Sequence, residues 1–353
     1  MTERIIDLYL LGMEICEPQT HEEMALFPLK SQLPEGPDYI TFSEALEQGV
    51  LEVTEVGPEG FVPELKAINR GKKAVLLLDG EELKGAKQNR VLNTTILVPG
   101  KSTITIPVSC VEAHRWHGQT LRMHASENVM ASMIRRKKME HVHNNLERIR
   151  SFEADQGDIW SMIDHLACSL ETKSTTSAMS DIFNQKENEM ESYLKSFNLI
   201  PGQKGLLVFL SGNPLGLDFI SRESAFARLY RKLLRSYVLE ALALKAEKTG
   251  RKDSSGSSKK ESTPQFAPDK EQARAFLEEA TRCQEKRFRS IGLGTDCRYR
   301  SETIIGAALE VDGSIPHLAF FPLNDSRNKS LKDKDDENFP GLRVRKSYLF
   351  SRE

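Results

Sequence analysis

The fold is decided by a run of short strands and turns in residues 74–116, which read AVLLLDGEELKGAKQNRVLNTTILVPGKSTITIPVSCVEAHRW. Residues 74–79 are a continuous apolar run closed by an aspartate, a pattern typical of a strand buried on both faces. Residues 90–98 and 102–112 flank a Pro-Gly dipeptide, which favours a turn, and they predict an antiparallel pair. Residues 79–90 read as the connection between these strands.

The chain before this run also indicates strands. Residues 51–56 (LEVTEV) alternate apolar and polar side chains with the period of a half-buried strand, and residues 62–69 are the predicted partner. Ser43 is placed to cap a short helix over residues 44–48. Residues 1–120 are therefore predicted to be a β-rich segment.

The middle of the chain, residues 121–246, changes character. Strand-forming residues become scarce, except in the predicted strand 205–210, which is followed by a predicted loop at 211–218. Apolar residues recur at helical spacing from Phe226 to Ala241. We expect this region to be mostly helical and packed on the first as one large domain. The other predicted helices cover residues 126–150, 158–170 and 178–197.

Residues 247–268 are rich in Ser, Gly, Lys and Pro, a composition typical of a flexible linker or loop. Residues 269–327 are predicted to return to the core as a helix over 269–290 and a β-hairpin that turns at Asp312-Gly313. Residues 328–353 form a charged tail. The fold class is thus α+β, with a mainly antiparallel sheet or sandwich in the N-terminal third, a helical middle, a strand-helix unit and a C-terminal hairpin.

Composition excludes some classes of protein. The 49 Lys and Arg residues balance 51 Asp and Glu residues, so the net charge of -2 argues against a nucleic-acid binder driven by overall positive charge. No apolar run reaches the roughly 18–20 residues of a membrane span. The five cysteines are scattered without a CxxC pair, and the N-terminus shows no signal-peptide cleavage pattern. We expect a cytoplasmic protein with reduced thiols.

Polar side chains are densest in residues 79–90. A plain connection needs only a few turn residues, whereas this one mixes charged and amide side chains with two glycines. Lys and Arg donate to phosphate or carboxylate, and Gln and Asn can hydrogen-bond a base or sugar. A solvated hairpin loop is the alternative interpretation. The candidate ligand-binding residues here are Glu81, Lys84, Lys87, Gln88, Asn89 and Arg90.

A second polar group ends the strand predicted at 102–112. Glu112 has the same strand parity as Cys110, so it should point toward the core and need a cation, from residues 79–90 or from Arg115. Burial would raise its pKa and make it the candidate general acid or base. Cys110 is a weaker candidate nucleophile, because a buried strand cysteine usually belongs to the core. In the alternative interpretation the strand ends earlier and Glu112 is exposed.

Other charged groups give weaker signals. The histidines near residues 114–124 and at 141 and 143 repeat no ligand spacing, so no metal site is predicted. Residues 135–138 (RRKK) could follow a phosphate backbone, which leaves an RNA-associated protein as a third hypothesis. A solvated helix face is the more usual interpretation, and the lack of interleaved aromatic residues argues against nucleic-acid stacking.

Residues 80–116 resemble the ARG and rhodanese-phosphatase-superfamily-associated protein domain, a largely uncharacterised family. The resemblance extends to residues 39–55 and 212–242 and covers most of the chain. It implies an association with ADP-ribosylglycohydrolase, rhodanese or phosphatase domains, and hence with ADP-ribose, NAD-derived or phosphorylated substrates. The positions that it marks are Glu81, Lys84, Lys87, Gln88, Asn89, Arg90, Cys110, Glu112, Arg115 and Trp116.

Two hypotheses of different classes follow. In the first, residues 80–90 and the end of the strand at 102–112 form one polar cleft for a small phosphorylated or nucleotide-like molecule, with Trp116 stacking on a ring. Any reaction would be a hydrolysis or group transfer, and no cofactor is indicated. In the second, the chain is a non-catalytic binding or adaptor domain with a structural ion-pair network at 80–116.

Overall fold

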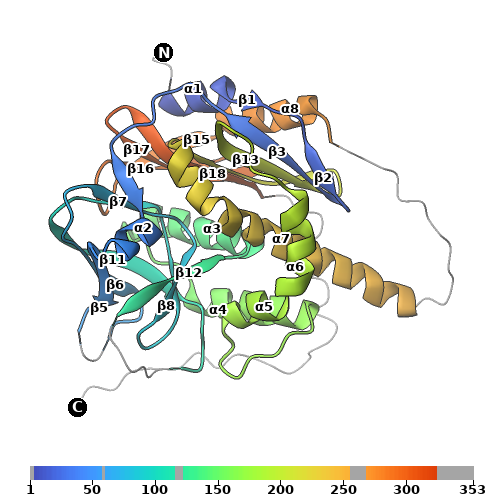
Figure 1. Ribbon diagram of the computed structural model, residues 1–353, viewed down its shortest axis with the longest axis horizontal. Helices are drawn as coiled ribbons and strands as arrows, with labels where there is room; N and C mark the ends of the chain where they lie inside the picture. Colours follow the sequence, from blue (N-terminus) through green and yellow to red (C-terminus); the bar gives the residue numbers. More distant parts are fainter. Residues whose placement is uncertain (1–3, 58–59, 116–121, 255–267, 324–353) are drawn as a thin grey trace.

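The chain has an α+β fold in which helices separate an N-terminal half-barrel from a large antiparallel sheet (Figure 1). Within the described residues, no helix combines the length and apolar character needed to cross a membrane. The structure is a computed structural model, and it describes residues 4–57, 60–115, 122–254 and 268–323.

A six-stranded antiparallel sheet forms the half-barrel. Its two outer strands come together, because Thr54 forms an antiparallel bridge with Arg122, the residue before the first strand of the sheet. The inside of the curve is apolar and includes Leu65, Ala67 and Val108. In sheet order the strands are β12 (Met123–Val129), β8 (Glu81–Gly85), β9 (Arg90–Leu92), β11 (Ser102–Cys110), β6 (Glu64–Asn69) and β5 (Leu51–Glu55).

A small sheet lies beside the half-barrel in the order β10 (Ile96–Val98), β7 (Ala74–Leu77) and β4 (Tyr39–Thr41), and β4 runs parallel to β7. Every residue of β7 is buried, as its apolar run predicts. The helix α2 (Phe42–Glu47) follows β4. Its cap is Thr41 and not the predicted Ser43, because Thr41 and Glu44 form a reciprocal capping box.

A nine-stranded antiparallel sheet gathers strands from both ends of the chain. Alternate residues of its strand β3 supply two separate cores, since Leu26 packs on one face and Phe27 on the other. Helices α1 (Ile5–Gly12) and α8 (Lys270–Thr281) cover the Phe27 face. The order is β1 (Glu14–Ile15), β3 (Met24–Lys30), β13 (Gln203–Leu210), β14 (Asn213–Ile220), β18 (Ser314–Pro322), β17 (Ile304–Val311), β16 (Thr295–Arg300) and β15 (Gln284–Arg289), with β2 (Gln19–His21) beside β3.

The other face of this sheet packs against α3 and α7, which lie between the sheet and the half-barrel (Figure 1). The apolar residues of α7, among them Phe226 and Leu233, belong to this second core together with those of the remaining helices. These helices are α3 (Ser132–Ile149), α4 (Gln156–Ser169), α5 (Met179–Gln185), α6 (Glu187–Ser196) and α7 (Glu223–Ser254).

The predicted fold class is confirmed, as are the strands at 51–56 and 62–69 and the hairpin at Asp312-Gly313. The predicted loop at 211–218 is wrong: only Ser211 and Gly212 turn, both with positive φ, and β14 follows at once.

Other segments also differ from the predictions, in their bounds or in their structure. Residues 126–129 belong to β12, so α3 begins later than expected, and residues 284–289 form β15, so α8 ends earlier. The polar segment at 79–90 is not a plain loop, because it contains β8, which pairs with β9 and β12. The helix α7 continues through Ser254, past the predicted start of the linker at 247, and residues 255–267 and 324–353 lie outside the described residues.

Candidate functional site

Glu112 lies just past the end of β11 and is buried, as strand parity predicts. Its carboxylate accepts hydrogen bonds from Arg115 Nη2 (2.7 Å), from the Asn89 backbone N–H (3.1 Å) and from Thr176 Oγ1 (2.9 Å). Burial acts to raise the pKa of Glu112, but the hydrogen bonds, first that from Arg115, leave it below its ordinary value. Glu112 therefore connects β11, the β8–β9 turn and the segment before α5.

The cations of the sequence motif are bonded within the half-barrel. Arg115 also donates to the Ala86 carbonyl (2.9 Å) and to Asn89 Oδ1 (3.2 Å). Arg90 is fully buried, donates to Gln88 Oε1 (3.2 Å) and forms an ion pair with Glu55 on β5 at 4.0 Å. These contacts hold the turn between β8 and β9 against the neighbouring strands.

The two glutamates of β8 are both linked to α7, Glu81 directly and Glu82 through β12. Glu81 forms a buried ion pair with Lys232 on α7 at 3.1 Å. Glu82 accepts hydrogen bonds from Ser126 (2.5 Å) and Asn128 (3.0 Å), and Asn128 in turn accepts one from Arg235 on α7. Burial raises the pKa of Glu82, and these two hydrogen bonds only partly oppose it.

The remaining candidates lie at the margin of this network. Lys84 and Lys87 are half-buried. Cys110 is buried, and burial raises its pKa to about 11, so its thiol is poorly ionised at neutral pH. Trp116 falls outside the described residues. The structure thus brings Gln88, Asn89, Arg90, Glu112 and Arg115 together as a hydrogen-bonded set, in which all but the partly exposed Arg115 are buried.

The sequence analysis missed a second polar cluster, here named the central polar cluster, which lies between the nine-stranded sheet, α3 and the end of β7. Its centre is Asp218 on β14, which is fully buried and accepts two hydrogen bonds from Arg135 on α3 (2.9 and 2.7 Å). Tyr237 on α7 donates to the same carboxylate (2.6 Å). Burial opposes ionisation, but the charge of Arg135 and the hydrogen bonds, including one from His317, hold the pKa of Asp218 well below its usual range.

A hydrogen-bonded chain leads from Asp218 back to the half-barrel side. The His317 ring lies 3.3 Å from Asp218 through Nε2 and 2.8 Å from Thr95 Oγ1 through Nδ1. Thr95 Oγ1 also accepts from the Asp79 backbone N–H (3.0 Å), so its own proton is free to point at Nδ1. The His317 ring therefore connects Asp218 to Thr95 and, through Thr95, to the Asp79 backbone.

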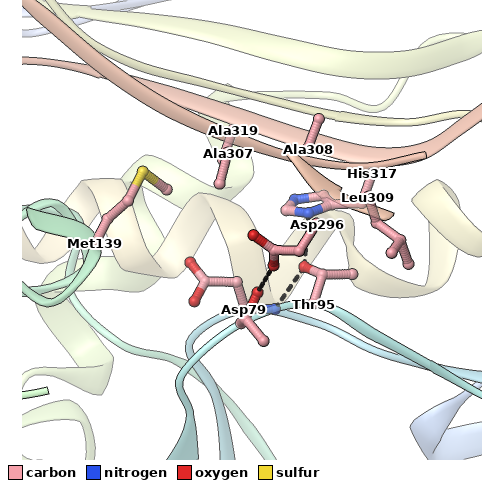
Figure 2. Close-up of a pocket in the computed structure, with 10 residues that line it drawn as sticks. Asp79, Thr95, Met139, Asp296, Ala307, Ala308, Leu309, His317 and Ala319 are labelled. Atoms are coloured by element: carbon pink, nitrogen blue, oxygen red, sulfur yellow. Dashed lines mark hydrogen bonds between the residues drawn. The ribbon is translucent and has the colours of Figure 1, made fainter. Parts of the chain in front are cut away.

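The order of hydroxyl, imidazole and carboxylate in this chain is also the order found in nucleophilic catalysis. Here it borders a small cavity whose walls include Asp79, Thr95 and His317 (Figure 2). The space open to the centre of a water molecule there is about 10 Å³, which is room for one water and not for a substrate.

Further ion pairs flank the cavity. Lys138 on α3 is fully buried and donates to Asp79 and to the Leu92 carbonyl. Burial lowers the pKa of Lys138 to about 8, against the opposing charge of Asp79. On the sheet side, Asp296 accepts two hydrogen bonds from Arg298 and one from Thr94 (2.6 Å).

Two residues of the basic run 135–138 belong to this cluster, whereas the sequence analysis interpreted the run as a solvated helix face or a surface for RNA. Arg135 and Lys138 are buried and bonded to aspartates, so they cannot serve as a surface for nucleic acid. Arg135 lies one turn before Met139 and Lys138 one turn before Val142, and this face shared with buried apolar residues was the usable clue. Among the described residues, no group of three or more His, Cys, Asp or Glu side chains is arranged to hold a metal ion.

The fold and the site define an α+β domain with two polar clusters, in each of which the side chains form ion pairs and hydrogen bonds with one another. The family model of the ARG and Rhodanese-Phosphatase-superfamily-associated Protein domain matches residues 12–321, and the chain therefore belongs to this family. No curated protein and no solved structure matches the chain.

Proposed function

We propose that this chain is a non-catalytic binding or adaptor domain, in which residues 80–116 form a structural ion-pair network. The observation that carries the proposal is the bonding of Glu112, whose two oxygens accept from three separate segments. A general acid or base works best with a pKa near the working pH, whereas these bonds hold the pKa of Glu112 below its ordinary value. Such a carboxylate is suited to connecting segments.

The contacts of β8 support the same interpretation. Glu81 connects the half-barrel to α7 through Lys232, and Glu82 does so through Asn128. Ion pairs of this kind shift pKa values without any catalytic role. Under this proposal residues 80–116 hold the half-barrel on the helical layer. A partner would then bind elsewhere on the surface of the domain.

The test is the Glu112→Gln substitution, measured by chemical denaturation. It keeps the size of the side chain but weakens three hydrogen bonds and leaves Arg115, only about a fifth exposed, without its carboxylate partner. We expect a loss of about 1–3 kcal/mol in the free energy of unfolding. The matched control is Glu52→Gln, because Glu52 also pairs with arginine, here with two arginines that are mostly exposed. This control should lose less than about 1 kcal/mol in the free energy of unfolding. Equal stability of the two variants would contradict the proposal.

A second candidate function is binding of a small phosphorylated, ADP-ribose-like or NAD-derived molecule at the edge of the motif. It is favoured by Lys84 and Lys87, which are half-buried and flank the Gly85 and Ala86 carbonyls contacted by Arg115, so that they could meet an anion. Hydrolysis or group transfer would then be the reaction. Under the first proposal, ADP-ribose, NAD and inorganic pyrophosphate leave the melting temperature unchanged. Under this second one they raise it, by mass action, and the Lys84→Ala/Lys87→Ala variant loses the rise.

A further inference from the structure

The cavity beside the central polar cluster has polar walls from four separate parts of the chain (Figure 2). Asp79 follows β7, Thr94 and Thr95 lie between β9 and β10, Asp296 is on β16 and His317 is on β18. Apolar side chains close the remaining walls: Met139 of α3, Leu309, Ala307 and Ala308 of β17 and Ala319 of β18. The cavity therefore has polar walls from the half-barrel side and from the sheet, and its apolar walls come from the sheet and from α3.

Two polar atoms, one on the wall residue Asp79 and one on a neighbour of Asp79, are buried without a hydrogen-bond partner. They are Oδ2 of Asp79 and Nε of Arg135. The atoms lie 3.8 Å apart, which is too far for a direct hydrogen bond. The Asp79 side chain is only 8% exposed and that of Arg135 is not exposed at all. A buried charged group with an unused hydrogen-bonding atom is unfavourable, so a partner is expected.

The charges around the cavity favour a neutral partner. Asp79, Asp218 and Asp296 are balanced by Arg135, Lys138 and Arg298, all of them in direct ion pairs. A cation or an anion would leave an uncompensated charge in the interior, whereas a water molecule adds none.

We propose that this cavity binds one ordered water molecule, which donates a hydrogen bond to Asp79 Oδ2 and accepts one from Arg135 Nε. The volume of about 10 Å³ open to a water centre fits a single molecule. A separation of 3.8 Å between the two atoms lets one water contact both at ordinary hydrogen-bond lengths. The water then connects the end of β7 with α3, beside the walls supplied by the nine-stranded sheet.

The direct test is a high-resolution crystal structure of the full chain. The proposal expects one spherical density peak about 2.7–3.2 Å from both Asp79 Oδ2 and Arg135 Nε. An empty cavity would overturn it, as would a direct bond between Asp79 and Arg135, or a peak at the roughly 2.0–2.4 Å distances of a coordinated metal ion.

A second measurement, magnetic relaxation dispersion of water oxygen-17, counts long-lived internal waters in solution. Ala319→Val adds two methyl groups to the cavity wall and should reduce the count by one. Ala67→Val is the matched control, because Ala67 is a buried strand alanine of the half-barrel that does not line the cavity, and it should leave the count unchanged. An unchanged count in a folded Ala319→Val protein would overturn the proposal, and the crystal structure decides it if that variant does not fold.

Discussion

Asp218 is the residue whose replacement tests the central polar cluster most directly. Its carboxylate is fully buried and holds Arg135 through two hydrogen bonds, with Tyr237 and His317 as further partners. Asp218→Asn preserves the size of the side chain but removes its charge. Arg135 would then be left in the interior with only Asp79 nearby, at 3.8 Å.

The expected loss is about 3–5 kcal/mol, the range measured when one partner of a buried ion pair is removed. This is a large part of the roughly 5–15 kcal/mol by which domains are stable. The pH dependence has a definite sign. Because the folded-state pKa of Asp218 lies well below the ordinary value of 3.8, the stabilisation is present above pH 3.8 and is lost as the pH falls below it.

The assay is urea denaturation followed by far-ultraviolet circular dichroism at pH 7 and at lower pH. Two comparisons isolate the buried pair. Glu17→Gln removes a surface pair with Lys270, in which Glu17 is 85% exposed, and should cost less than about 1 kcal/mol. The double variant Arg135→Met/Asp218→Leu removes both buried charges and should recover much of the stability. A loss below about 1 kcal/mol in Asp218→Asn, or a double variant no more stable than it, would refute the reasoning.

Three further substitutions or probes test other parts of the structure. The Glu82→Gln variant should be at least as stable at pH 7 as the unmodified chain. Because burial raises the pKa of Glu82, its carboxyl group destabilises the fold increasingly as the pH rises above the unfolded pKa of 4.5. In thermal melts, the advantage of the Gln variant should therefore shrink toward acid pH. A thiol reagent should label the exposed Cys168 well before Cys110, which is buried with a raised pKa; equal rates would contradict this burial. Gly216→Ala should lower stability by about 1–3 kcal/mol in urea denaturation, because its Cβ would lie 2.7 Å from the Phe321 ring, and a neutral effect would show that the strands can separate there.

Local periodicity was sufficient to predict much of the fold. The alternation in residues 51–56 and the apolar run at 74–79 correspond to β5 and β7, and the Asp-Gly turn corresponds to the β17–β18 hairpin. The loop predicted at 211–218 failed because the Gly, Asn and Pro residues there act within a strand. Pro214 lies at a register shift, and Gly216 leaves room for an aromatic ring. Such roles depend on neighbouring strands, so the segment alone cannot reveal them.

Strand parity and polar density predicted that residues 80–90 and Glu112 lie together, but they could not predict the distant residues to which these side chains bond. These partners lie far away in the chain, since Thr176 completes the bonding of Glu112 and Lys232 that of Glu81. The central cluster was missed for the same reason, because Arg135 and Asp218 meet only when α3 packs on β14.

The two clusters explain why a chain with so many charged residues can place them in its interior. Buried charges are stable only when each is paired and hydrogen-bonded. In the central cluster each cation pairs with a carboxylate. Lys138 on α3 pairs with Asp79 at the end of β7, and Arg298 pairs with Asp296 two residues earlier on β16. Correct pairing therefore requires the half-barrel, the helices and the large sheet to meet in one arrangement. On this argument the polar clusters specify how the layers of the domain assemble, and the unused atoms of Asp79 and Arg135 mark the position where one water molecule completes that assembly.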